Sequence, residues 1–458
     1  MKITKNLTEG NIYRNLILYA LPLILSSMLS QAYSTVDGII AGKCIGEFAL
    51  GAVSATGSFD TLFLSLMGGF ATGYAIYVSH IYGSGQFGMI KRDILAMTGL
   101  VGLIAIAISV ISILLREPIM SYLKVDPLLS ADAERYFIIY TAGFAVYFIN
   151  QLLIHTLYAL GVTSFSLYIS LLSAILNIGG NLLTVQVFGM GVAGLALSTL
   201  LSSAVATVCY VCLLRGAFRE MRCEEVSARF DLSGIAHSLR YSLPAALQQM
   251  TFHGIGFLIA PSINGLGAAA TTGYNIANRI YGIGTQSLWA VTSAFSCYTG
   301  QCVGKGDCEK IRRGLRAGFI LNVAAMLPPV LILALLAHPI VSLFFPATHM
   351  GEAYGYAIRY ATVFLPFVYI QLVGHILHSY MRSLGCVSTV LWITLVGSVT
   401  RVVATLMLVP LLRLDGVFLA QIISWTLDAF ISVILCLTCY RKPAQLERLI
   451  RRAHISGK

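Results

Sequence analysis

About twelve long apolar segments determine what this chain can fold into. A helix that spans a bilayer needs about 20 predominantly apolar residues, and these segments are of that size or longer. Because hydrocarbon offers no hydrogen-bond partners, a spanning segment must pair its own backbone, as an α-helix does. The sequence therefore predicts an all-α membrane protein, with spans at residues 13–41, 51–79, 93–115, 133–160, 164–188, 190–214, 238–262, 268–299, 314–337, 355–382, 386–410 and 416–440.

Composition agrees with a polytopic membrane protein. The chain is 57% hydrophobic and only 11% charged, whereas an average soluble protein is about 25% charged. The net charge of +11 could indicate a nucleic-acid partner. The basic residues cluster between apolar segments, however, which is typical of membrane topology. We therefore expect the lipid bilayer as a partner and no nucleic acid.

The distribution of basic residues predicts the orientation. With the N-terminus inside, the inner segments hold 22 of the 30 Lys and Arg residues and the outer segments hold 6, while Arg279 and Arg401 lie within spans. Cytoplasmic loops carry the excess of Lys and Arg. Lys2, Lys5 and Arg14 precede an apolar run that continues as the first span, so we expect no cleavable signal. The chain should lie in the cell membrane with both termini in the cytoplasm.

The two halves of the chain repeat each other at offsets of 221–225 residues. Six spans per half is an even number, so both halves enter the membrane with the same polarity. Such parallel repeats are related by a pseudo-two-fold axis along the membrane normal. The doubled motifs are Tyr19-Ala-Leu-Pro22 with Tyr241-Ser-Leu-Pro244, Gly83-Ser-Gly85 with Gly304-Lys-Gly306, Leu160-Gly161 with Leu384-Gly385, and Gly191-Val192 with Gly416-Val417.

This repeat predicts four parts. Residues 1–214 form an N-lobe, 215–237 a basic cytoplasmic connector, 238–440 a C-lobe, and 441–458 a basic cytoplasmic tail. Two packed six-helix bundles with a cleft between them suit alternating access.

A polar stripe runs along the first span. Ser26, Ser30, Tyr33 and Asp37 recur at steps of four, three and four residues, so they share one helical face. Ionisable groups within spans are costly and usually mark ion or substrate paths. The alternative is that Asp37 lies at the water interface, because Lys43 follows about 9 Å further along the helix.

A second stripe lies on the fifth span, where Ser170, Ser173, Asn177, Asn181 and Thr184 follow helical spacing. Oxygen-rich ligands of this kind suit a hard cation such as sodium. The alternative is that the two asparagines only join helices, through hydrogen bonds worth about 1 kcal/mol or less.

The C-lobe and the second span hold further candidates for cavity or proton-relay roles. Histidine titrates near physiological pH, although packing by hydrogen bonds is an equally physical role. The pair His375-x-x-His378 has no visible third metal ligand. Asp60 lies about 14 Å into its span, facing either the N-lobe cavity or the outer water. The candidates are Asp60, His253, Gln371, His375, His378 and Asp428.

Two stretches carry a resemblance to a known family: LPLILSSMLSQAYSTVDGIIAGKCIGEFALGAVSA at 21–55 and ILNIGGNLLTVQVFGMGVAGLALST at 175–199. Together with the paired glycine-basic loops, they resemble the multidrug and toxin extrusion (MATE) transporters, in their bacterial NorM-like and DinF-like range. The resemblance implies two six-helix lobes, a V-shaped central cleft, and efflux of cationic or amphiphilic compounds. It also implies coupling to protons or sodium ions, and function as a monomer.

The resemblance places the family's N-lobe cation site on Asp37, Asn177, Asn181 and Thr199. Many relatives have Asp where this chain has Asn181. The acidic pair that NorM-like relatives carry in the C-lobe is also missing here, which leaves Asp428 as the main C-lobe candidate. A sodium ion at the coupling site is the only bound ion that this pattern implies, and no cofactor is expected.

Three classes of function are compatible with these features. A secondary active exporter is favoured by the repeat, the buried carboxylate and the resemblance. A flippase of a lipid-linked precursor, known in the wider superfamily, would need several cationic groups, and only Arg279 and Arg401 lie well inside spans. A membrane-embedded enzyme is disfavoured, because no phosphate-binding loop, HExxH motif or nucleophile–base constellation is visible.

Overall fold

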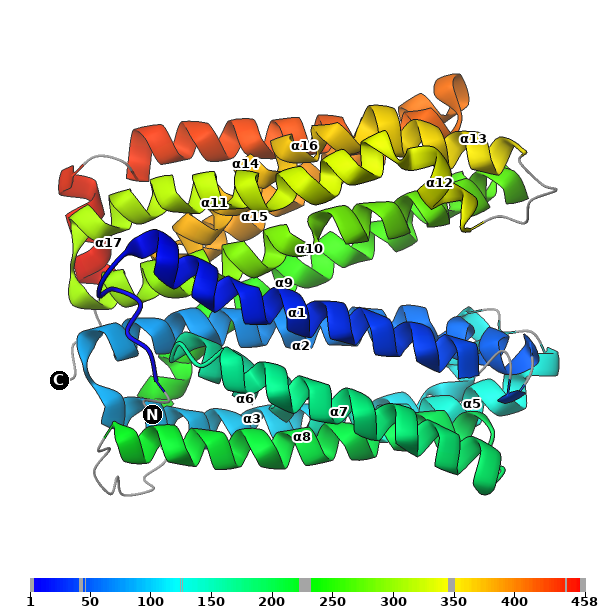
Figure 1. Ribbon diagram of the computed structural model, residues 1–458, viewed down its shortest axis with the longest axis horizontal. Helices are drawn as coiled ribbons and strands as arrows, with labels where there is room; N and C mark the ends of the chain where they lie inside the picture. The colour runs from blue at the N-terminus through cyan, green and yellow to red at the C-terminus, as the bar shows by residue number, and fades with distance from the viewer. Residues whose placement is uncertain are drawn as a thin grey trace. The chain divides into compact units, whose positions relative to one another are not determined.

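The computed structural model describes residues 4–40, 44–45, 47–123, 125, 127–221, 232–344, 351–440 and 443–453. These residues form helices and short connections, without a β-strand in any of the ranges given (Figure 1). The all-α prediction is confirmed. Lys43, Lys124, Arg222 and Arg229 of the charge count lie outside the described residues, as do parts of the predicted connector and tail.

The helices of the N-terminal half are α1 (Ile12–Ile40), α2 (Glu47–Ser84), α3 (Phe87–Leu114), α4 (Arg116–Tyr122), α5 (Pro127–Ala142), α6 (Phe144–Ala159), α7 (Ser164–Leu182) with the π-helical turn Leu183–Val187, and α8 (Val192–Glu220).

Those of the C-terminal half are α9 (Leu232–Asn264), α10 (Ala268–Lys305), α11 (Cys308–Leu335), α12 (Ala337–Ser342), α13 (Glu352–Arg359), the π-helical turn Tyr360–Phe364, the 3₁₀ turn Leu365–Phe367, α14 (Val368–Ser383), α15 (Val387–Leu412), α16 (Leu414–Leu435), the π-helical turn Cys436–Tyr440 and α17 (Pro443–Ala453).

Nine helical stretches of the described chain are long and apolar enough to cross a membrane. A tenth forms if α5 and α6, which are bent by 46°, act as one span. The long helices α9 and α10 bring the segments to the expected twelve, but they are less apolar than the others. Polar amides such as Gln248, Gln249, Asn275 and Asn278 recur along both. Gln248 is buried and donates a hydrogen bond to Thr394 at 3.0 Å, whereas Asn275 and Asn278 are exposed.

Apolar side chains remain exposed on the helices of both halves. Leu103 on α3, Trp392 and Met407 on α15 are 70%, 67% and 68% exposed. Large exposed apolar surfaces are rare on soluble monomers and indicate contact with a membrane or a partner. On helices of this length and hydropathy, they are the faces turned to lipid.

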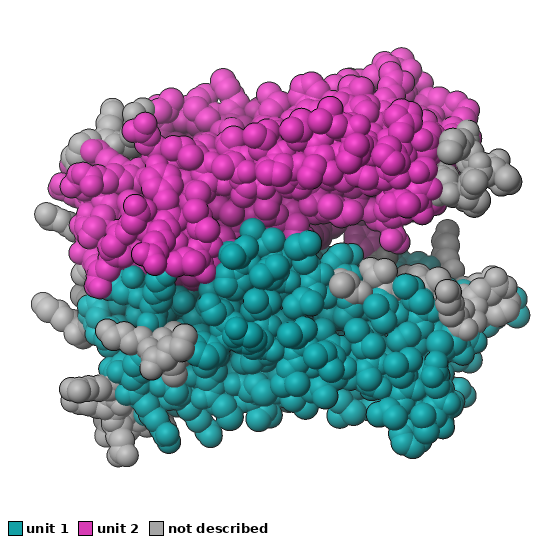
Figure 2. Space-filling model, in the orientation of Figure 1, with its two compact units in different colours: residues 1–6, 21–246 teal, residues 7–20, 247–458 magenta. Residues whose placement is uncertain are grey.

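The chain divides into two compact units, coloured in Figure 2. The first unit holds residues 1–6 and 21–246, and the second holds residues 7–20 and 247–458. The start of α1 therefore belongs to the second unit, and the start of α9 to the first. The predicted lobes, residues 1–214 and 238–440, follow the sequence repeat rather than these compact units, and their bounds stay a prediction.

Each unit has the same pattern of helix packing. In the first, α2 packs on α5 and α6, α6 on α3 and α8, and α7 on α8. In the second, α10 packs on α13 and α14, α14 on α11 and α16, and α15 on α16. Each of these five pairs in one unit has its counterpart in the other, as expected for a duplicated bundle.

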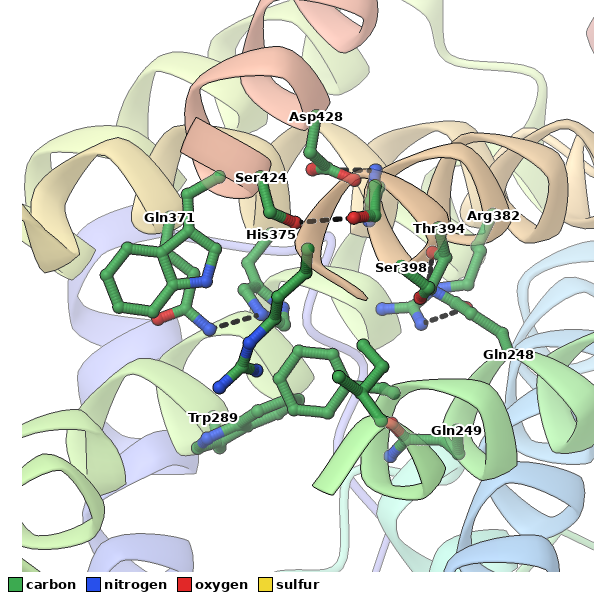
Figure 3. Close-up of a pocket in the computed structure, with 16 residues that line it drawn as sticks. Gln248, Gln249, Trp289, Gln371, His375, Arg382, Thr394, Ser398, Ser424 and Asp428 are labelled. Carbon is green, nitrogen blue, oxygen red and sulfur yellow. Dashed lines mark hydrogen bonds and ion pairs between the residues drawn. The ribbon is translucent and has the colours of Figure 1, made fainter. Parts of the chain in front are cut away.

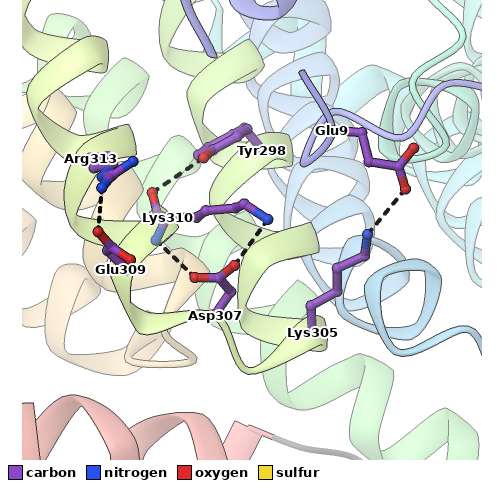
Figure 4. A network of polar contacts seen from close by, with 7 residues as sticks. All are labelled: Glu9, Tyr298, Lys305, Asp307, Glu309, Lys310 and Arg313. Atoms are coloured by element: carbon purple, nitrogen blue, oxygen red, sulfur yellow. Dashed lines mark hydrogen bonds and ion pairs between the residues drawn. The ribbon is translucent and has the colours of Figure 1, made fainter. Parts of the chain in front are cut away.

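The start of α1 is held within the second unit by polar contacts. Gln301 on α10 accepts a hydrogen bond from the Leu7 amide at 2.9 Å, and Lys305 Nζ lies 3.6 Å from Glu9 Oε1. Figure 4 shows this ion pair beside the turn between α10 and α11. Both contacts are made by residues that precede α1, so they attach the segment before this helix to α10.

Asp307 caps α11 in the same turn. Its side chain accepts a hydrogen bond from the Lys310 amide at 3.0 Å, and Lys310 Nζ lies 3.0 Å from its other oxygen (Figure 4). Burial alone would raise the pKa of Asp307, but the hydrogen bonds and charge of Lys310 outweigh it and lower that pKa. An aspartate cap satisfies a free amide at the helix N-terminus.

The repeat is visible in backbone conformation. Gly191, which precedes α8, has φ 57° and ψ −138°, and Arg413, which precedes α16, has φ 53° and ψ −132°. The structural counterpart of Gly191 is therefore Arg413, not Gly416 as the motif alignment predicted. Gly416 has no positive φ. A side chain is strained in this conformation, and Arg413 is the only non-glycine residue with positive φ among the described residues.

We expect Arg413→Gly to stabilise the protein by about 1 kcal/mol, because relief of backbone strain exceeds the entropy that glycine adds to the unfolded chain. Thermal unfolding in neutral detergent measures this. Gly191→Ala is the matched control and should lower the melting temperature, since no atom lies within 4 Å of the added carbon and only the backbone is strained. An unchanged or lower melting temperature for Arg413→Gly would contradict the strain.

Candidate functional site

The first candidate site lies in the first unit, where α1 meets α7. Asn181 Nδ2 donates a hydrogen bond to Asp37 Oδ1 at 2.5 Å, and its distance to Asn177 Oδ1 is 3.4 Å. Both asparagines are buried, and Asp37 is half-buried. The last residue of the first predicted stripe thus meets a residue of the second, 144 positions further along the chain.

Helix α8 supplies the third side of this site. Asn177 Nδ2 donates a hydrogen bond to Thr199 Oγ1 at 3.2 Å. The structure therefore joins all four residues that the resemblance placed at a cation site, in the order Asp37, Asn181, Asn177 and Thr199.

One oxygen at this site has no partner. Asn181 Oδ1 is buried and accepts no hydrogen bond from the described residues. A buried acceptor without a donor costs about 1–3 kcal/mol. The oxygens of Asp37, Asn177, Asn181 and Thr199 are the hard ligands that sodium prefers, so this donor set fits a sodium ion as well as a proton.

Asp60 lies on α2 of the same unit. Its side chain is buried, and Oδ1 has no partner among the described residues. Asp60 therefore faces the interior of the first unit rather than outer water, although no hydrogen bond joins it to Asn181.

The second candidate site is a pocket of about 50 Å³ inside the second unit. Figure 3 shows it between side chains of α9, α10, α14, α15 and α16. Gln371, His375, His378 and Asp428, which the sequence analysis predicted, all line it. This volume holds a few water molecules or a small polar group.

An acidic and a basic group meet on one wall. His378 Nε2 lies 3.3 Å from Asp428 Oδ2, and the two side chains are only 6% and 19% exposed. Gly374 makes this possible, because an added Cβ would lie 2.5 Å from the Asp428 oxygen. Asp428 is thus positioned by α14 as well as by its own helix.

The opposite wall is aromatic. Tyr281 donates a hydrogen bond to Gln371 Oε1 at 3.0 Å, and Gln371 Nε2 lies 3.1 Å from His375 Nε2. The Trp289 and His375 rings meet edge to face, with centroids 4.5 Å apart. His375 is held by a tyrosine–glutamine chain on one side and by an indole on the other.

Two arginines complete the pocket and were not predicted as site residues. Arg382 Nη1 donates a hydrogen bond to Gln248 Oε1 at 3.0 Å, and Arg401 Nη2 donates one to Gln421 Oε1 at 3.4 Å. Arg382 is the penultimate residue of α14 and lines the pocket. Its helical spacing from Gln371, His375 and His378 was the signal that could have identified it.

His253, which was predicted as a candidate, does not line the pocket. It is exposed, and only its neighbours Phe252 and Ile255 line the pocket. Its ring lies edge to face against Phe252, with centroids 5.4 Å apart. Within the described ranges no three His, Cys, Asp or Glu side chains come close enough to hold a metal ion.

Comparison with known proteins identifies the family. A sequence model of the family MatE matches residues 22–183 and, a second time, residues 244–407. The chain belongs to the MatE family. The two matches begin 222 residues apart, within the offsets that the doubled motifs predicted. The resemblance to MATE transporters is confirmed, and a multi-pass membrane transporter rather than an enzyme is supported.

Two curated relatives are similar over most of their length. The probable multidrug resistance protein YpnP of Bacillus subtilis (strain 168) is 25% identical over 403 residues, which are 85% of this chain and 86% of that protein. The multidrug resistance protein MdtK of Cronobacter sakazakii (strain ATCC BAA-894) is 22% identical over 315 residues, 67% of this chain and 68% of that one.

Solved structures share the fold. A MOP superfamily transporter from Pyrococcus furiosus superposes with a TM-score of 0.85 at 18% identity, covering 99% of both chains. A MATE transporter in complex with MaL6 gives a TM-score of 0.86 at 17% identity, covering 97% of this chain and 98% of that one. The MatE chain described here therefore has the fold of a multidrug efflux transporter family.

We expect the Asp37–Asn181 hydrogen bond to appear as a coupling free energy of about 1.5–3 kcal/mol, the range for bonds to charged groups. A double-mutant cycle of Asp37→Ala and Asn181→Ala, read by reversible unfolding in detergent, measures it. Asn150→Ala is the control partner, because Asn150 bonds instead to Thr207 at 3.0 Å and its effect should add to that of Asn181→Ala. Additivity of the Asp37 and Asn181 changes would mean that the bond contributes nothing.

Proposed function

We propose that this MatE protein is a secondary active antiporter that exports small amphiphilic, often cationic, organic compounds in exchange for protons or sodium ions. The observation that carries this proposal is the intramembrane carboxylate of Asp37, bonded to Asn181 beside a buried oxygen without a partner. The protein functions as a monomer in the plasma membrane, with both termini in the cytoplasm.

The coupling step follows from charge in a medium of low dielectric. A carboxylate there favours any cation that reaches it, and proton or sodium binding neutralises it. Asn177, Asn181 and Thr199 contribute amide and hydroxyl oxygens that exchange hydrogen bonds for ion contacts. Asn181 donates a hydrogen bond to Asp37. A cation that binds the Asp37 carboxylate displaces this hydrogen bond, and the contact between α1 and α7 therefore changes.

Neutralisation of Asp37 therefore changes how α1 packs against α7. The charged form holds α1 against α7 through a short hydrogen bond of 2.5 Å. The neutralised form loses the charge that makes this bond strong. A ligand shifts a conformational equilibrium only by its different affinity for the two states, and this bond provides such a difference.

We expect Asp37→Asn to abolish gradient-driven export while leaving the protein folded and inserted, because it removes only the charge from a nearly isosteric group. Export of a fluorescent cation from proteoliposomes, under separately imposed proton and sodium gradients, measures this. Protein content and thermal stability of each preparation are the controls.

Full coupled export by Asp37→Asn would remove Asp37 from the mechanism. Export by the parent protein that needs ATP, or that occurs under neither gradient, would refute the antiporter as a whole.

Asn181→Asp should change the ion dependence of export, because a second carboxylate raises the negative charge of the site and favours cation binding. The same vesicles give the measurement, as the ion concentration for half-maximal export. Asn150→Asp is the matched control, since Asn150 bonds to Thr207 and takes no part in the Asp37 cluster. An ion dependence equal to that of the parent would make Asn181 a packing residue.

A further inference from the structure

Two guanidinium groups of the second unit lack a carboxylate partner among the described residues. Arg382 and Arg401 both line the pocket of Figure 3, and each is hydrogen-bonded to a neutral glutamine oxygen. Charged groups removed from water are normally paired with an opposite charge. The single carboxylate that lines this pocket, Asp428, instead lies against His378.

The pocket also holds polar atoms without partners. Arg382 Nε, Arg401 Nε and Ser398 Oγ are buried and make no hydrogen bond within the described part of the chain. All three can donate, and all three residues line the same pocket. With two arginines against one aspartate, the lining carries an excess of positive charge when its histidines are neutral. An oxyanion would satisfy both the charge and the donors, since guanidinium forks match carboxylate and phosphate geometry.

Large apolar side chains also line the pocket. Phe252, Ile255, Trp289 and Trp425 line the pocket beside the arginines. Trp289 and Phe252 meet edge to face, with centroids 6.0 Å apart. A free inorganic ion would gain nothing from these rings, whereas a molecule with an apolar body next to its charged head would bury that body against them.

We infer that this pocket binds the oxyanion head group, a phosphate or carboxylate, of an amphiphilic molecule. The arginines and Ser398 hold the head group, which is the part that a volume of about 50 Å³ accommodates, and only the adjoining part of the apolar chain contacts the aromatic side chains. Binding itself does not depend on coupling to ions; that the bound molecule is also exported rests on the function proposed above. This deepens that function, because it adds anionic and zwitterionic amphiphiles to the substrate class.

The test is equilibrium binding of octyl phosphate to the full-length protein in maltoside micelles, without an ion gradient. Two of the three tryptophans of the chain line the pocket, so their fluorescence reports occupancy. Octyltrimethylammonium, which has the same chain and the opposite charge, is the ligand control. The oxyanion could be free inorganic phosphate or the head group of an amphiphile, and inorganic phosphate as a competitor distinguishes the two. Competition indicates a site for the free ion, whereas a lack of competition indicates that binding needs the apolar chain.

We expect saturable binding of octyl phosphate, weakened at least about tenfold in Arg401→Gln, as for loss of a charge-assisted hydrogen bond. Arg401→Lys keeps the charge and should bind between the two. Ser398→Ala, which removes one hydroxyl and perturbs the fold least, should weaken binding by a few fold. Arg279→Gln is the matched control: Arg279 is also an intramembrane arginine of this unit, but it is exposed and does not line the pocket.

Equal binding of octyl phosphate and octyltrimethylammonium, or unchanged binding in Arg401→Gln and Ser398→Ala, would overturn the inference and make the arginines structural. Since the measurement uses no gradient, it is independent of coupled export. A protein that exports under a gradient but fails here refutes only the oxyanion site, and one that binds here but does not export refutes only the antiporter.

Discussion

The hydrogen bond between Asp37 and Asn181 is the polar contact that joins α1 to α7 in the first unit, and the proposed coupling depends on it. It joins residues 144 positions apart, at 2.5 Å, on two helices that must lie in hydrocarbon. A carboxylate there needs a donor or a cation, because the bilayer interior supplies neither. The bond between α1 and α7 and the proposed binding of a cation therefore have the same physical origin.

The two units share one pattern of helix packing but carry side chains of different chemistry. Their helices pack in the same pattern, and Gly191 and Arg413 share an unusual conformation at equivalent positions. The side chains have diverged: the first unit joins a carboxylate to amides, whereas the second gathers guanidinium groups beside Asp428. This is possible because each helix satisfies its own backbone hydrogen bonds, so that interior side chains can change without loss of the fold.

Sequence periodicity predicted the features that are determined within one helix. The spans, the repeat and the polar stripes through Asp37 and Asn181 could all be predicted from spacing, since residues three or four apart share a face. The contacts of Arg382 with Gln248 and of Asp428 with His378 could not, because each joins separate helices whose rotation is set by packing. The exposure of His253 was missed for the same reason. The strain at Arg413 was hidden because the alignment of doubled motifs paired Gly191 with another glycine.

Charge balance relates the two sites. In the first unit the unmatched group is an oxygen, Asn181 Oδ1 beside a carboxylate, and in the second it is a pair of guanidinium nitrogens. A buried group without a partner costs free energy in the empty protein, and a ligand that supplies the partner recovers it. The cation proposed for the first site and the oxyanion proposed for the second are the partners that these unmatched groups lack. Under the proposed function the first site takes the coupling cation, so the groups of a substrate that this protein must recognise are the oxyanion and the apolar body that the second site is proposed to bind.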